Sequence, residues 1–359
     1  MAEIATLTTI LPIVATLQNG REKRELHSLV TEIIMPEFDQ IIETLNICAN
    51  MLLYNSPQHP DPTKRIERGP PVKLPVSSSK SEMVKGIITR DGIYVTHLSV
   101  NLREAHFNRH IHRITLDQPI LLPQLITAKE SIDNAVLLLQ NFNADQNHSD
   151  LCTSFENILE EVSRAKHSLQ LPTDPSLVFP QHEIEAQWFR PSLPHNLALD
   201  MYINQAELCI DLKNLHRVTE EPWCHIDPQT GKSYVDTVRD EMKAGKPLDS
   251  IMEELDHRGS QGGSPSSTPR TAAGSGSATP THSGGAASGL AATLSHLLKP
   301  KIDPMEYVTK CSTYANSVVM VTKKIEVSSP DPLLVSTSTK LDSLENIISC
   351  FLHNLKAVN

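Results

Sequence analysis

The chain contains 359 residues, enough for two domains of ordinary size, and its formal net charge is −10. This acidic balance disfavours nucleic-acid binding, which depends on Lys and Arg side chains that neutralise phosphates. No run of residues approaches the ~18 uncharged apolar residues of a membrane-spanning helix, so we do not expect an integral membrane protein.

The first predicted element is a helix from Leu26 to Leu52, because its apolar residues recur at alternating steps of four and three. Leu45 lies on this apolar stripe. Pro36 lacks a backbone N–H and therefore predicts a kink within the helix. Residues 56–80 follow, and their six prolines and three consecutive serines predict a loop without regular structure.

Two β-branched segments, Val84–Thr89 and Ile93–Leu102, are predicted to form a hairpin. The Asp-Gly pair between them is a strong signal for a tight turn. His110–Leu116 is a third candidate strand, and a short piece within 177–189 is a fourth. The β-branched segment Ser317–Val327 lies far away in the sequence, and we expect it to join the same small sheet.

Three helices are predicted between these strands, over 122–142, 151–169 and 194–218. The helix over 194–218 is apolar on more than one face, which is typical of the buried centre of a bundle. The last helix begins at Pro332, a residue that suits a first helical turn. Its leucines recur at heptad steps, which predicts a coiled-coil-like seam.

Together these elements predict an α+β fold, with an antiparallel helical bundle formed by both chain ends and a small antiparallel β-sheet domain. Both parts are assembled from non-contiguous segments. The predicted bundle comprises residues 20–55, 118–171, 192–222 and 331–359. The predicted β-domain comprises residues 81–117, 174–191 and 312–329. The predicted bundle core includes Leu45, Leu208, Leu212, Leu344, Ile348 and Phe351.

Residues 223–303 are predicted to be an insertion that contains a disordered linker over 256–290. The linker consists almost entirely of Gly, Ser, Thr, Ala and Pro, which bury too little apolar surface to offset the entropy of ordering. Ser264, Thr268 and Thr279 each precede a proline and are candidate phosphorylation sites. A phosphate there would add about −1.5 to −2 charges, although such dipeptides also arise from composition alone.

No catalytic constellation is predicted, and we expect no metal ion or cofactor. Gly231-Lys232-Ser233 is similar to the end of a phosphate-binding loop, but Ile226 occupies the place of the first glycine. His106, His110 and His112 form the densest histidine group, yet no cysteine lies near them at ligand spacing. The six cysteines lie far apart without a C-x-x-C pair, which favours the reducing cytoplasm.

A collinear set of short motifs resembles the Rogdi family over residues 22–222 and 312–357. No single motif is specific, but their order is. The motifs are Val84-Lys85-Gly86, Val100-Asn101-Leu102, Ala128-Lys129, Leu137-Leu138-Leu139, Trp188-Phe189-Arg190-Pro191-Ser192-Leu193-Pro194, Tyr202-Ile203-Asn204, Leu208-Cys209, Leu215-His216 and Glu326-Val327-Ser328.

This resemblance implies an elongated, non-enzymatic protein that acts as the second subunit of the RAVE complex. That complex promotes assembly of the peripheral sector of the vacuolar proton ATPase onto its membrane sector. The implied partners are a WD-repeat large subunit, a Skp-family adaptor in some lineages and peripheral-sector subunits of the ATPase. The implied location is the cytoplasm, with peripheral recruitment to vacuolar or endosomal membranes and no direct insertion into the bilayer.

Two other hypotheses remain open from the residues alone. The helical surfaces also suit a scaffold subunit of an unrelated cytosolic complex, such as a tethering or cytoskeletal assembly. An enzyme is the third hypothesis, and the histidine group is its only support in the sequence.

Overall fold

The computed structural model describes residues 23–77, 84–103, 112–253 and 303–358. The chain divides into two compact units. The larger unit is Met1–Asn214 with Lys323–Asn359, and the smaller unit is Leu215–Thr322. The predicted linker, with Ser264, Thr268 and Thr279, lies outside the described residues.

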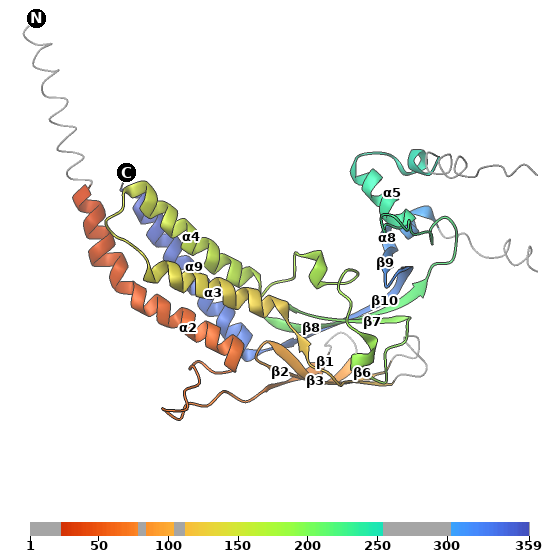
Figure 1. The fold of residues 1–359 in the computed structure, drawn as a ribbon, viewed down its shortest axis with the longest axis horizontal. Coiled ribbons are helices and arrows are strands. Elements are labelled where there is room, and N and C mark those ends of the chain that lie inside the picture. Colours follow the sequence, from red (N-terminus) through yellow and green to blue (C-terminus); the bar gives the residue numbers. More distant parts are fainter. Residues whose placement is uncertain (1–22, 78–83, 104–111, 254–302, 359) are drawn as a thin grey trace, which may run out of the picture. The chain divides into compact units, whose positions relative to one another are not determined.

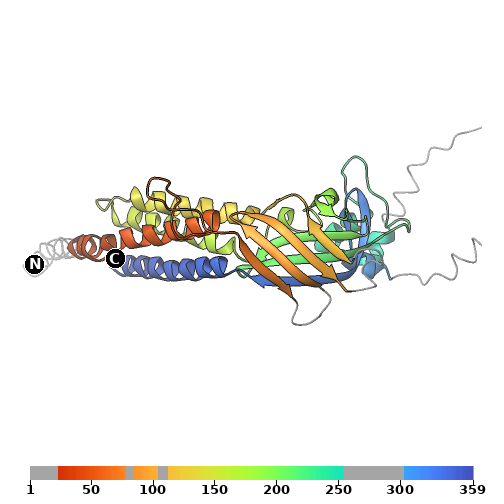
Figure 2. The same ribbon diagram turned by 90° about the horizontal axis from the view of Figure 1, so that it is seen from below.

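Four long helices pack side by side as a bundle in the larger unit (Figure 1, Figure 2). They are α2 (Phe38–Tyr54), α3 (Pro123–Gln140), α4 (His148–His167) and α9 (Pro332–Ala357). Helix α9 contacts both α2 and α4, so the two ends of the chain share one bundle, as predicted. Their apolar stripes explain this pairing, because neither helix would stay folded with its stripe exposed to water.

The chain before α2 changes helix type around Pro36. A π-helical segment, η1 (Leu29–Ile34), is followed by a 3-10 turn, η2 (Met35–Glu37), which contains the proline. Pro36 cannot donate the backbone hydrogen bond that a continuous α-helix requires at this position. The interruption predicted at Pro36 is therefore present, as a change from π-helical to 3-10 hydrogen bonding.

The first sheet has the strand order β1-β2-β3-β4-β6, and β5 also pairs with β3. Its strands are β1 (Val72–Ser77), β2 (Val84–Asp91), β3 (Tyr94–Leu102), β4 (Arg113–Leu116), β5 (Ile120–Leu121) and β6 (Phe189–Arg190). The predicted hairpin is thus present. The prediction of a loop without regular structure over 56–80 is wrong for β1, where Leu74 and Val76 are buried. Pro75 is tolerated because β1 is an edge strand.

The predicted helix over 194–218, and the assignment of 192–222 to the bundle, are wrong. These residues form the hairpin of β7 (Leu197–Asn204) and β8 (Glu207–Arg217). Nearly every residue of β7 is buried, and Ala198 and Tyr202 place apolar side chains beside Asp200 on the second face, which blurs the alternation typical of a half-exposed strand. The turn adds no signal, because Gln205 and Ala206 adopt the positive φ values usually taken by Gly or Asn.

The segment Ser317–Val327 forms a strand, but it does not join the β2–β3 hairpin as predicted. It lies in β10 (Ser317–Pro330), in a second sheet of order β7-β8-β10-β9, where β9 is Cys311–Tyr314. The fold is therefore α+β, with two antiparallel sheets instead of one. The second sheet could not be expected once the hairpin that supplies two of its four strands had been interpreted as a helix.

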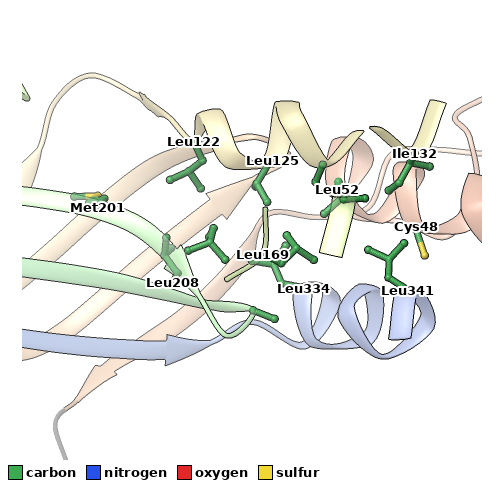
Figure 3. Close-up of a cluster of buried hydrophobic side chains, with 14 of the residues drawn as sticks. Cys48, Leu52, Leu122, Leu125, Ile132, Leu169, Met201, Leu208, Leu334 and Leu341 are labelled. Atoms are coloured by element: carbon green, nitrogen blue, oxygen red, sulfur yellow. The ribbon is translucent and has the colours of Figure 1, made fainter. Parts of the chain in front are cut away.

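One hydrophobic cluster extends from the bundle to β7 and β8 (Figure 3). Leu45, Leu344 and Ile348 are buried in it, whereas Phe351 is half-buried and packs edge-on against Phe155. Leu208 and Leu212 are fully buried in the same cluster, but from strand β8 and not from a bundle helix. In the close-up, side chains from α2, α3, β7, β8 and α9 converge. The bundle and the β-strands around it are parts of one packed unit.

The smaller unit has its own hydrophobic cluster around Trp223. The Trp223 ring stacks on Tyr307 with ring centroids 4.8 Å apart, and it meets the Tyr234 ring edge-on. The unit contains α5 (Tyr234–Lys243) and α8 (Pro304–Lys310). The predicted insertion 223–303 thus contributes helix α5 and part of this hydrophobic cluster.

Candidate functional site

A buried ion pair fixes the end of the β2–β3 hairpin in the larger unit. Arg90 Nε donates to Asp331 Oδ2 at 2.6 Å, and neither side chain is exposed to solvent. Arg90 Nη1 also donates to the side-chain oxygen of Asn55 and to the carbonyl oxygens of Gly92 and Leu52. Burial of an ion pair needs such additional hydrogen bonds, because desolvation of both charges is costly. We call these residues the hairpin hub.

Local structure places each member of the hub. Asn55 ends α2 in the left-handed conformation that Asn tolerates, and its amide nitrogen donates to Asp91. A shift in strand register between Thr89 and Arg90 accompanies the inward position of the arginine. Asp331 caps α9 by accepting from the backbone N–H groups of the first turn. In the sequence, the Asp331-Pro332 pair indicates the start of a helix. The arginine that pairs with Asp331 lies 241 residues away, so no local pattern indicates the ion pair.

A mainly apolar cleft of about 390 Å³ lies beside the hub. Arg68 and Asp91 form an ion pair of 2.6 Å at this cleft. Tyr94 and Leu121, which pair across β3 and β5, are both exposed next to it. The arrangement can hold an apolar side chain of a partner beside a polar pair, which suits binding. The lining residues are Leu53, Tyr54, Arg68, Asp91, Ile93, Tyr94, Thr96 and Pro119.

A second buried polar group lies on β7 and β8. Asp200 and Asp211 are directly opposite each other in the strand register. Asp200 Oδ1 is 2.7 Å from His182 Nδ1, and Asp211 Oδ2 accepts from Lys213 at 2.5 Å. Lys213 Nζ also lies 4.8 Å from the centroid of the Phe179 ring. Like charges on opposite strand positions repel, so these partners stabilise the pair and fasten the preceding segment to the strands.

Three buried cysteines, Cys48, Cys209 and Cys311, do not have the properties of nucleophiles. Burial raises the pKa of the Cys48 and Cys209 thiols to about 12 and that of Cys311 to about 11. These thiols therefore stay protonated at neutral pH, whereas a thiolate is needed for nucleophilic attack or metal binding.

The histidine group is described only at His112, because His106 and His110 lie outside the described residues. Within the described ranges, no group of three or more His, Cys, Asp or Glu side chains is placed to hold a metal ion. Ser233 caps α5 and accepts a hydrogen bond from the Asp236 amide, and Lys232 pairs with Asp240. The segment that is similar to a phosphate-binding loop is thus a turn followed by a helix cap.

Among the helices that the structure describes, none is both long and apolar enough to cross a membrane. The longest, α9, has 26 residues but carries polar side chains throughout.

Comparison with known proteins finds one match that extends over nearly the whole chain and others that cover less than half of it. The chain is 28% identical over 365 residues to the protein of Saccharomyces cerevisiae named "Regulator of V-ATPase in vacuolar membrane protein 2", a match that covers 93% of this chain and 91% of the yeast protein. It is 25% identical over 162 residues to "Protein rogdi homolog" of Rattus norvegicus and 24% identical over 164 residues to that of Homo sapiens. These two matches cover 44% of this chain and 56% of each mammalian protein. The Rogdi leucine zipper containing protein model matches residues 25–356, so the chain belongs to that family.

Proposed function

We propose that this chain is a non-catalytic adaptor subunit of the RAVE complex, which promotes assembly of the peripheral sector of the vacuolar proton ATPase onto its membrane sector. One observation carries the proposal. The similarity to the yeast regulator of V-ATPase extends over 93% of this chain and 91% of that protein. A match of this extent relates the whole architecture, the bundle and the sheets, and not a single shared module.

The described residues support an adaptor role by what they offer for binding. The hairpin hub makes a rigid base for the adjacent cleft, and a preorganised surface loses less entropy when a partner binds. The proposed partners are a WD-repeat large subunit, peripheral-sector subunits of the ATPase and, in some lineages, a Skp-family adaptor. Recruitment to the vacuolar membrane would then follow from these protein contacts.

The test is reassembly of the ATPase in cells that lack this protein. After starvation is relieved, we expect the fraction of peripheral-sector subunits that sediments with vacuolar membranes to recover slowly in these cells. The intact chain should restore the rate. A variant with Ile348→Asp and Phe351→Asp should not, because it places charge in the seam between the terminal helices.

A matched control distinguishes disruption of the helix seam from the mere addition of two negative charges to α9. Val335→Asp with Ile347→Asp adds the same charge to exposed positions of the same helix, and this variant should restore reassembly. Equal sedimenting fractions and equal recovery rates with and without the protein would reject the proposed function.

A further inference from the structure

One face of the first sheet is open to solvent. Strand residues alternate between the two faces, and Leu74, Ile88 and Val100 point into the hydrophobic cluster on the inner face. The register places Ser77, Lys85, Asn101 and Arg113 in one row across β1 to β4 on the opposite face. In Figure 2, strands β1 to β3 (orange) lie in front, and no described helix or strand of the larger unit crosses before them.

The register aligns the outer-face residues of these strands in three rows, from Lys73, Thr89 and His97 to Ser77, Lys85, Asn101 and Arg113, and every ionisable residue in these rows is basic. The chain as a whole carries a net charge of −10, and Asp91, which pairs with Arg68, lies on the same side of the sheet beyond the register shift after Thr89. We call this surface the basic face. Its ionisable residues are Lys73, Lys85, His97, Arg113 and Arg190.

Two of these cations have no carboxylate partner among the described residues. Lys73 and Arg113 are both exposed, and no ion pair includes either of them. Arg113 is held in place by two hydrogen bonds from its guanidinium to Ser99 Oγ, at 3.1 and 2.9 Å. Arg190, in contrast, pairs with Asp117 just beyond the end of β4. A guanidinium that is held in place and lacks an ion-pair partner can donate two hydrogen bonds to the oxygens of one carboxylate.

The dimensions of the basic face fit a short polypeptide segment. Lys73 on β1 and Arg113 on β4 are three strand spacings apart at ~4.8 Å each, and their register rows are offset by four residues along the strands, which gives a diagonal of roughly 20 Å. About six extended residues span that distance. Ile87 lies between them on β2 and is 50% exposed, so it can pack against an apolar side chain of the occupant.

The same features disfavour a lipid surface. Peripheral membrane binding combines many basic residues with several inserted aromatic or large aliphatic side chains. The three rows of the basic face expose one large aliphatic side chain, Ile87, and contain no Phe, Tyr or Trp, whereas Tyr94 lies beyond the register shift, opposite Asp91. Nucleic acid is disfavoured as well, because the net charge of the chain repels a polyanion.

From this charge complementarity we propose that the basic face is a docking surface for an acidic, mostly extended segment of a partner protein. The carboxylates of that segment pair with Lys73 and Arg113, and one of its apolar side chains covers Ile87.

The test places a photo-crosslinking residue in the full chain in cells, in place of Ser77 on the basic face or of Leu137 on an exposed face of α3. Position 77 should crosslink to a protein segment rich in Asp and Glu, whereas position 137 should not. Lys73→Glu with Arg113→Glu should lower the yield of that adduct at least tenfold. Lys64→Glu with Arg65→Glu makes the same change of net charge on the loop after α2 and should leave the yield unchanged.

Three crosslinking results would overturn the inference: no adduct at position 77, an adduct with a segment that is not acidic, or a yield that charge reversal does not change. Vesicles containing 30% phosphatidylserine supply the remaining comparison. If the purified full chain sediments with them and Lys73→Glu with Arg113→Glu abolishes this, the occupant is a lipid surface and the inference is wrong. The inference does not rest on the proposed function, since an acidic partner segment can be found whether or not ATPase reassembly depends on the chain.

Discussion

The two hairpins of the larger unit, β2–β3 and β7–β8, have the same topology but very different sequence signals. Both are antiparallel pairs joined by two-residue turns, Gly92-Ile93 and Gln205-Ala206. The first has Gly92 in its turn, directly after Asp91, and strands with one solvent-facing side. The second has neither a glycine in its turn nor an exposed face on β7. The comparison teaches that a hairpin is readable only when its local chemistry and its burial pattern agree.

The two hairpins also differ in what holds them. The β2–β3 hairpin depends on the hub, in which Arg90 pairs with a residue from the far end of the chain. The β7–β8 hairpin packs one aliphatic face into the hydrophobic cluster and buries Asp200, Asp211 and Lys213 on its other face. Its edge is capped by Gln124, which donates to the Ile203 carbonyl and accepts from its N–H. The first hairpin thus depends on an ion pair with a distant segment, and the second on the burial of both its faces.

The largest expected effect comes from removing the anchor of the first hairpin. Arg90→Met leaves Asp331 buried without its partner, and we expect a loss of about 3–5 kcal/mol in the free energy of unfolding. Urea denaturation followed by circular dichroism measures this loss.

A second substitution separates the charge from the packing. Adding Asp331→Ser to Arg90→Met removes the unpaired charge and keeps a residue that can cap α9. The double variant should recover at least half of the lost stability. A double variant as unstable as the single one would show that the ion pair is not what anchors the hairpin.

A smaller loss is expected when the turn of the first hairpin is altered. Gly92 has φ +60°, and a Cβ there would lie 2.5 Å from the Leu53 carbonyl oxygen. Gly92→Ala should therefore cost about 1–3 kcal/mol. Gly231→Ala serves as the control, because Gly231 also has positive φ but its added Cβ would meet nothing within 4 Å. If both variants lose the same stability, the close approach to Leu53 has no energetic role.

The opposite change should strengthen the second hairpin. Gln205 is exposed and has φ +50°, so Gln205→Gly relieves a left-handed conformation without removing a buried contact. We expect a gain of about 0.5–1 kcal/mol, measured as a higher urea midpoint with an unchanged slope. Gln205→Ala should give no gain. A gain from alanine as well would point to the loss of the glutamine side chain and not to the turn.

The smallest expected effect concerns an ion pair between two helices of the bundle, α4 and α9. A hydrogen bond from Lys166 on α4, together with one from Ser163, lowers the pKa of Glu345 on α9 below its ordinary value of 4.5. The ionised carboxylate therefore contributes stability above pH 4.5, and this is lost as the pH falls through the lowered pKa.

Glu345→Gln should consequently cost about 0.2–1 kcal/mol at pH 7, as is usual for a partly exposed pair. The difference from the unsubstituted chain should shrink below pH 4.5, as measured by thermal melting across pH. A difference that is constant with pH would mean that the loss does not come from the charge of Glu345.

The sequence by itself determined the helices of the bundle and the first hairpin. Helix periodicity is a local property, and α4 and α9 each carry an apolar stripe that is complete within the element. The helix start at Pro332 and the Asp91-Gly92 turn are also set by the residues at those positions.

Only the tertiary structure decided what depends on distant neighbours. Residues 197–212 are apolar at most positions, and such a run becomes strand or helix according to what covers its two faces. The burial of Arg90 follows from Asp331 and Asn55, and no local pattern brings the three together. The basic face likewise appears only when four strand registers align Lys73, Lys85, Arg113 and Arg190 on one side of a sheet. Register is fixed by which face the core covers, so the charge of a surface is a property of the fold.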